Sequence, residues 1–212
     1  MADKEILIFV EGPSDKVFLE VYLYFLEDFP IKNFKVKDVK GKDNLSKRLL
    51  EIEKYDKTLI IFDANKDYES NKKEILTVVS KRKQTISEEQ IFLFPNNQDD
   101  GDLETLLLEI AKHDDFLKCF EGYLECIKSK EHYKPIKNIR KNMLYAYLEA
   151  LGLENLTKTN IDVFDSKGKI KEKNKEEYEK LKEAIDFNSK SLIPLKNFLG
   201  QFAENKQKTN LF

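Results

Sequence analysis

Short apolar runs, each followed by polar residues, mark the first half of the chain. The runs at residues 5–10, 59–62 and 91–94 are almost continuously apolar and rich in β-branched or aromatic types. That pattern predicts strands buried on both faces, as in the middle of a parallel sheet. Residues 34–39 instead alternate Phe and Val with Lys and Asp, which predicts a shorter strand with one face in water.

Amphipathic segments with helical spacing separate and follow these runs. We expect helices at about residues 16–28, 45–54, 68–83, 102–110, 116–129, 139–150, 177–185 and 192–203. Strand alternating with helix predicts βαβ units, and therefore an α/β fold with a mostly parallel, Rossmann-like sheet sandwiched by helices. We place an α/β domain over residues 1–112 and a helical C-terminal region, packed on it, over residues 113–212.

Composition narrows the function classes. The chain is 41% hydrophobic and 36% charged, which is typical of a soluble, ordered protein. Lys and Arg number 37 against 39 Asp and Glu, so no global basic field indicates nucleic-acid binding. Local basic patches stay open at Lys40 with Lys42 and at Arg140 with Lys141, although a solvated surface is the simpler interpretation of any one of them. The mixed Lys and Glu run at residues 167–182 predicts a solvated loop and helix start.

Neither a membrane span nor a targeting segment is predicted. No apolar run approaches the roughly 18 residues that a span needs. Residues 1–5 carry no signal-peptide pattern, and Cys119 and Cys126 lack the spacing of metal ligands. We therefore expect a cytoplasmic protein that does not engage a membrane.

Acidic residues follow three of the predicted strands. Glu11 comes after the first strand, Asp63 with Asn65 and Asp67 after the third, and Asp102 with Glu104 beyond the fourth. In a parallel sheet these strand ends lie on one edge, where ligands bind. Carboxylates there would suit Mg²⁺ (or Mn²⁺), and a second metal would allow in-line phosphoryl displacement.

Helix capping is the alternative explanation for these acids. Asp15 and Asp102 both stand where an N-cap belongs, and for Asp15 we favour the capping interpretation. Glu11 and Asp63 are not needed to start a helix, so for them we favour a functional role. The sequence argues against a calcium loop beginning at Asp63, because Tyr68 occupies the position of the turn glycine.

Other chemistries find less support. We expect His113 and His132 to be ordinary surface residues, and Cys119 and Cys126 to be packed helix cysteines and not nucleophiles. Neither the P-loop pattern nor G-x-G-x-x-G occurs. The turn at residues 12–14 could still hold a phosphate on its backbone N–H groups.

The ordered motifs resemble a known family. Ile8 to Gly12, Ile60 to Asn65 and the Asp-Leu-Glu of residues 102–104 resemble the Toprim domain of topoisomerases, bacterial primases and OLD-type nucleases. Together with Gly41 to Leu45, Phe94 to Asn97 and the late Ile193 to Leu199, they are most similar to domain-of-unknown-function family 3226, a Toprim-like group.

The resemblance implies roles for individual residues. It implies that Glu11 acts as general acid or base or as a metal ligand, and that Asp63 binds Mg²⁺ as the first member of an Asp-x-Asp motif. Asn65 replaces the second Asp, which weakens the expected site, and Asp67 could compensate. Glu104, and less firmly Asp102, match the acid that holds a second metal in the OLD-type pattern.

Two functions follow as expectations. The first is a Mg²⁺- or Mn²⁺-dependent nuclease, or a related phosphoryl-transfer enzyme, acting on DNA or RNA. The second is a catalytically silent Toprim-like module that binds nucleic acid or a protein partner, which the near-neutral net charge favours slightly. A homodimer stays open in either case.

Overall fold

A single parallel sheet forms the centre of the protein. The computed structural model describes residues 6–26, 34–80, 86–134, 136, 138–154 and 170–202. The strands are β1 (Ile6–Val10), β2 (Phe34–Asp38), β3 (Lys57–Asp63) and β4 (Ile91–Phe94). They pair in the order β2-β1-β3-β4, and every pairing is parallel. The predicted α/β fold class is therefore confirmed.

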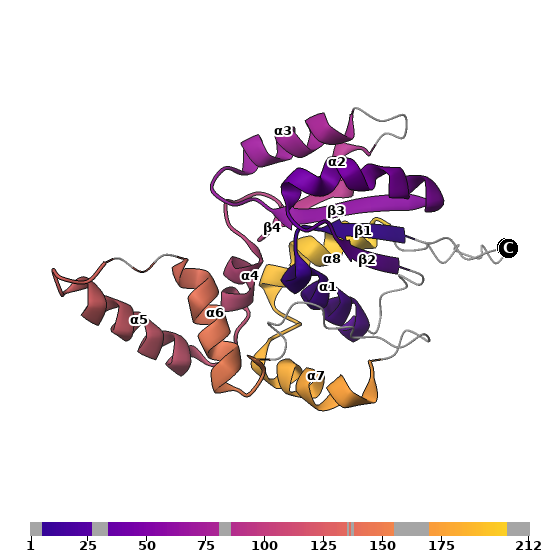
Figure 1. The fold of residues 1–212 in the computed structure, drawn as a ribbon. Helices are drawn as coiled ribbons and strands as arrows, with labels where there is room; N and C mark the ends of the chain where they lie inside the picture. Colours follow the sequence, from indigo (N-terminus) through magenta and orange to yellow (C-terminus); the bar gives the residue numbers. More distant parts are fainter. Residues whose placement is uncertain are drawn as a thin grey trace, which may run out of the picture.

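Alternate side chains of these strands supply two separate cores. Ile8, Val10, Ile61, Phe92 and Phe94 face the core shared with α1 (Pro13–Phe25) and α4 (Leu103–Glu109). The residues between them face the core shared with α2 (Leu45–Arg48), the following 3₁₀ helix (Leu49–Lys54) and α3 (Tyr68–Val79). Helices thus cover both faces of the sheet (Figure 1), which explains why its strands read as continuous apolar runs.

The C-terminal helices extend the first of these cores. They are α5 (Asp114–Lys128), α6 (Ile139–Ala150), α7 (Glu172–Ala184) and α8 (Ile193–Gly200). Buried residues of α6, α7 and α8 join the core that contains Ile8 and Phe92. The boundary after residue 112 stays a prediction. Within the described ranges, no helix is long and apolar enough to cross a membrane.

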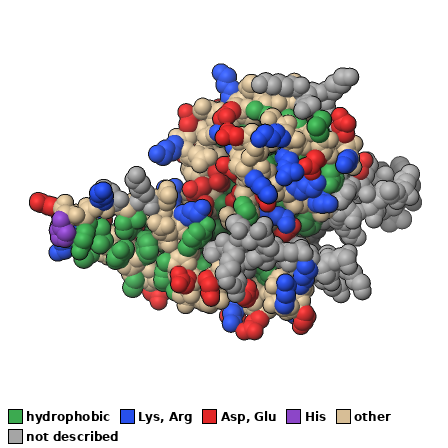
Figure 2. Space-filling model, viewed as in Figure 1, with side chains coloured by type: hydrophobic (Ala, Val, Ile, Leu, Met, Phe, Trp, Pro, Cys, Tyr) green, Lys and Arg blue, Asp and Glu red, His purple; other side chains and the backbone are tan. Residues whose placement is uncertain are grey.

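Helix α5 contributes little to this core: Phe116, near its start, packs against Tyr147 of α6. It projects with α6 from the side of the molecule (Figure 1), and Leu124 is its one buried residue. Figure 2 shows hydrophobic side chains along this projecting part, and Tyr123 is 52% exposed. The prediction that Cys119 and Cys126 are packed was wrong. Both are free and exposed, because only one stripe of α5 contacts the rest of the protein.

This exposure predicts thiol reactivity in the native state. We expect Ellman's reagent to modify both Cys119 and Cys126 in the folded protein within about tenfold of the rate in urea, since access and ionisation control thiol reactivity. Stopped-flow absorbance measures both rates, and Cys119→Ser assigns the phases. Protection of either thiol until the protein unfolds would contradict the position of α5.

Two helix predictions also need correction. The segment expected as one helix over residues 45–54 splits into α2 and a 3₁₀ helix. Helix α7 begins at Glu172, earlier than the predicted residue 177, because its first turns carry Lys and Glu without an apolar residue to reveal the period. The ends predicted at residues 28, 83 and 203 lie outside the described residues.

Candidate acidic site at the sheet edge

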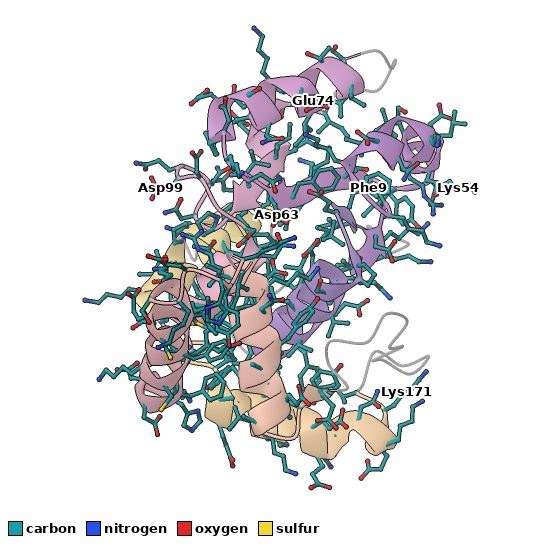
Figure 3. All side chains as sticks on the ribbon, turned by 60° about the vertical axis from the view of Figure 1, so that its left-hand side comes forward. Phe9, Lys54, Asp63, Glu74, Asp99 and Lys171 are labelled. Atoms are coloured by element: carbon teal, nitrogen blue, oxygen red, sulfur yellow. The ribbon has the colours of Figure 1, made fainter. Side chains whose placement is uncertain are left out.

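The strand order reverses direction between β1 and β3. From β1 the chain passes through α1 to β2 on one side, and from β3 it passes through α3 to β4 on the other. The crevice beyond the carboxyl ends of two such strands is where open α/β sheets bind ligands. Glu11 directly follows β1, and Asp63 is the last residue of β3. Figure 3 shows Asp63 at the sheet end that meets the C-terminal helices.

Asp63 is a carboxylate held at this edge by another element. Its Oδ1 accepts a hydrogen bond from the backbone N–H of Leu103, at 3.0 Å, which ties β3 to the start of α4. Burial, followed by the negative charges of Asp15 and Glu11, raises the pKa of Asp63 to about 9. Burial and these neighbouring charges therefore favour the protonated form of Asp63 at neutral pH.

Glu11 has an oxygen that lacks a hydrogen-bond partner. Among the described residues, its Oε2 is buried and accepts no hydrogen bond. Burial raises the pKa of Glu11, while the backbone of Asp63 and the charge of Lys42 oppose that shift. A buried oxygen of this kind can bind a metal or accept a hydrogen bond from a water or a substrate.

Asp15 joins the same group of acids. It is the third residue of α1 and not the N-cap: its Oδ2 accepts from the backbone N–H of Gly12, at 2.7 Å, which is one half of a capping box, because Gly12 has no side chain for the other half. Asp15 thus helps to cap α1, but from the third helical position and not from the predicted N-cap, and it is only 6% exposed. Burial, together with Glu104 and Glu11, raises its pKa to about 7. We call Glu11, Asp15, Asp63 and Glu104 the acidic cluster.

Glu104 completes the cluster from the first turn of α4. Burial raises its pKa, with a contribution from Asp102, while Lys141 of α6 opposes the shift. Burial works to lower the pKa of Lys141, but Tyr145, Glu104 and Asp15 together raise it. Arg140 donates to Thr105 Oγ1 at 2.9 Å. Arg140 and Lys141, two of the four basic residues named from the sequence, therefore flank the acids from α6.

The charge of the cluster is not balanced by close ion pairs. Each ion pair found among the described residues joins groups outside the cluster. Lys42, which influences Glu11, is bonded instead to Asn71 and Glu74 of α3, at 2.6 and 2.7 Å. Several carboxylates thus share one partly desolvated region, which is a common arrangement at functional sites.

Three predicted ligands hold local backbone instead of pointing into the cluster. Asp67 is exposed and caps α3, accepting from Ser70 N–H at 2.9 Å. Asp102 caps α4 through Thr105. Asn65 adopts a left-handed conformation and bonds to the backbone of Asp63 and Gly101. Their role as metal ligands stays a prediction, and their geometry gives each a structural reason to be present.

Gly101 fastens the loop that carries α4 toward Asp63. Its φ is 143°, and an added Cβ would lie 3.0 Å from both Pro95 Cδ and Thr105 Oγ1. Its N–H and carbonyl pair with Asn65, at 2.7 and 2.6 Å. We expect Gly101→Ala to lower the free energy of unfolding by about 1–3 kcal/mol, measured by urea titration. Gly122→Ala is the control, since a Cβ there meets nothing within 4 Å; equal stability of the two variants would contradict the strained loop.

The prediction that His113 is an ordinary surface residue was also wrong. It is half-buried, and its Nδ1 lies 2.7 Å from Tyr147 Oη, which in turn donates to the Ala184 carbonyl at 2.8 Å. This chain of hydrogen bonds joins the start of α5 to α6 and α7, away from the cluster. His132 is exposed, as predicted.

The acidic cluster suits a hard cation in donor type and charge. Carboxylate oxygens are the ligands of Mg²⁺ and Mn²⁺. Among the described residues, the buried Glu11 Oε2 has no hydrogen-bond partner and could serve as such a ligand. No group of three or more His, Cys, Asp or Glu in the described part of the chain is already arranged as a metal site. Waters and substrate oxygens would therefore complete the shell, as is usual for Mg²⁺.

The fold and the site define an α/β protein with an acidic cluster at the switch point of a parallel sheet. Its sequence places it in a family: the chain belongs to the protein family of unknown function DUF3226, whose sequence model matches residues 5–204. That match confirms the family predicted from the ordered motifs. Comparison with curated proteins and with solved structures gives no match.

Proposed function

We propose that the protein is a Mg²⁺- or Mn²⁺-dependent enzyme that cleaves or transfers phosphodiesters of nucleic acid, in the manner of Toprim nucleases. One observation carries the proposal. Glu11 and Asp63 lie at the ends of neighbouring strands at the switch point, where Asp15 and Glu104 add further carboxylates, and no ion pair among the described residues includes any of the four.

The acidic residues would have two roles in this reaction, which are metal binding and proton transfer. Asp63, with Glu11 or Glu104 beside it, would hold the divalent ion together with waters and substrate oxygens, and Asp15 would add to the negative field that attracts it. When bound, the ion would supply Lewis-acid stabilisation of the negative charge on the phosphoryl oxygens. Where Glu11 does not bind the ion, it would take up a proton from the attacking water, because burial raises its pKa and so makes it a stronger base than a free carboxylate.

The basic side chains of α6 would meet the substrate. Arg140 and Lys141 lie on the first turn of α6, next to Thr105 and Glu104. A phosphate approaching the acids would thus pass two cations, which offset the repulsion between the substrate and the cluster. This local patch supports nucleic acid as the substrate despite a net charge of −2.

Cleavage of a labelled panel tests the proposal. We expect wild type with Mn²⁺ or Mg²⁺ to cut at least one of single- or double-stranded DNA or RNA, and Glu11→Gln and Asp63→Asn each to lower the rate by at least about 100-fold. Glu69→Gln, an exposed acid on α3, is the matched control. Cutting that survives both cluster substitutions would contradict the proposal, and circular dichroism would confirm that the variants are folded.

A silent binding module is the second candidate. Asn65 in place of an acid, and the capping roles of Asp67 and Asp102, favour it. On this alternative, the labelled strands are retained in a gel shift without being cut, and Lys141→Gln weakens retention while Asp63→Asn does not. Absence of both cutting and retention would exclude nucleic acid as the ligand of this face.

A further inference from the structure

A pocket lies at the opposite end of α1 from the acidic cluster. It has a volume of about 390 Å³ and lies between the end of α1, the end of α7 and the segment before α8. Three lysines and three aromatic residues line it: Lys112, Lys182, Lys196, Tyr22, Phe25 and Phe187. At about 1.5 Å per residue along α1, Phe25 is about 15 Å from Asp15, so the two sites are distinct.

Backbone hydrogen bonds hold the walls of this pocket in place. The segment that precedes α5 pairs with the segment that follows α7: Lys112 N–H donates to Ala184 at 2.9 Å, and Asp186 N–H donates to Ile110 at 2.8 Å. Lys112 Nζ also donates to the Lys182 carbonyl at 2.8 Å. Two of the three lysines are therefore carried by segments with a fixed separation.

The floor of the pocket is aromatic. The Phe187 ring lies 5.2 Å from the Phe25 ring and 6.3 Å from the Tyr22 ring, measured between centroids. The Nζ of Lys182 lies 4.3 Å from the Phe25 centroid, a cation–π distance that keeps this ammonium at the pocket wall. The plane of the Phe187 ring is tilted by 46° from that of Phe25 and by 26° from that of Tyr22, so a flat, apolar ring system could pack against one of these rings.

The charge at the rim is positive. Lys112 and Lys196 are exposed, and the one acid of the lining, Asp186, already accepts from Asn188 N–H at 3.0 Å. Lys196 forms no hydrogen bond or ion pair with any residue in the described ranges. Ammonium groups above an aromatic floor fit a ligand with an anionic end and a flat apolar end, in a volume typical of small-molecule sites.

We propose that this pocket binds one nucleotide unit, with its phosphate at Lys112 and Lys196 and its base on the Phe25–Phe187 floor. The same chemistry is presented by a free nucleoside monophosphate and by the phosphorylated end of a strand. The inference is independent of the proposed catalytic site, since no residue of the acidic cluster lines the pocket.

Isothermal titration of the full chain with nucleoside 5′-monophosphates tests this site. We expect a nucleotide to bind at least about tenfold more tightly than its nucleoside or ribose 5-phosphate, since each of these lacks one of the two contacts. Lys112→Gln and Lys196→Gln should each weaken binding by about tenfold. Lys190→Gln, an exposed lysine outside the lining, and Asp63→Asn should leave the affinity unchanged.

Competition decides the source of the nucleotide unit. Displacement by a 5′-phosphorylated tetranucleotide at lower concentration than by the monophosphate would assign the pocket to a strand end, and the reverse would assign it to a free nucleotide. The proposal is overturned if no monophosphate binds at several millimolar, if both lysine variants bind normally, or if ribose 5-phosphate binds as tightly as the nucleotide. Loss of binding in Asp63→Asn would place the ligand at the acidic cluster instead.

Discussion

Asp63→Asn is expected to make the metal-free protein more stable than wild type above neutral pH, by an amount that grows with pH. The raised pKa of Asp63, about 9, means that the folded state holds this proton more tightly than the unfolded chain does. An unfolded Asp loses its proton near pH 3.9. The contribution of protonated Asp63 to the stability of wild type is therefore fully present below about pH 4 and is lost as pH rises toward about 9.

Asn imitates the protonated acid at every pH. It keeps an oxygen for the Leu103 N–H and removes the charge that must otherwise be buried beside Asp15 and Glu11. One proton difference changes stability by at most about 1.4 kcal/mol per pH unit. Because Asp63 is half-buried, solvent screening reduces the effect, and we expect a gain on the order of 2 kcal/mol between pH 6 and pH 8.

Urea titrations in a chelator at pH 6, 7 and 8 measure this difference. Asp67→Asn is the matched control, because it removes an exposed carboxylate outside the cluster and should change stability by a constant amount over this range. A difference between Asp63→Asn and wild type that does not vary with pH would show that Asp63 is already ionised in the folded protein.

Buried strands are the part of the fold that sequence predicts best. β4 was predicted at residues 91–94 and is observed there, because a strand covered on both faces must be apolar throughout. Helices on the outside are harder to delimit. The start of α7 at Glu172 offers only Lys, Asn and Glu before Tyr178, so tertiary contact at Tyr178 and Leu181, and not a local pattern, fixes where this helix lies.

The site was predictable only in part, for a related reason. The convergence of Glu11 and Asp63 follows from parallel pairing of β1 and β3. Asp67 and Asp102 also follow strands. Helix caps and metal ligands use the same residue types, so only the side-chain direction, which the sequence does not reveal, distinguishes a cap from a ligand. Asp15 is the reverse case, because its position at a helix start led us to assign it to capping alone, although it also belongs to the acidic cluster. The sequence signal for that second role was its closeness to Glu11, the acid at the end of β1.

Mn²⁺ is expected to raise the melting temperature of wild type at pH 8 and to leave it unchanged at pH 5.5. Carboxylates must lose their protons to bind metal, and burial and mutual repulsion raise the pKa values of Asp63 and Asp15 to about 9 and 7. A ligand at about 100 times its Kd stabilises the native state by about 2.7 kcal/mol. For a chain of this size that corresponds to a shift of about 5–10 °C.

Scanning calorimetry of the variants locates the ion. Asp63→Asn and Glu11→Gln should each remove most of the Mn²⁺-induced shift at pH 8, while Asp67→Asn should retain it, because Asp67 is committed to capping α3. If the Mn²⁺-induced rise in melting temperature were lost in Asp67→Asn but kept in Glu104→Gln, the ion would bind at the loop after β3 and not at the acidic cluster. No shift in wild type at several millimolar Mn²⁺ would contradict a metal site altogether, and the cluster would then hold protons as its only cations.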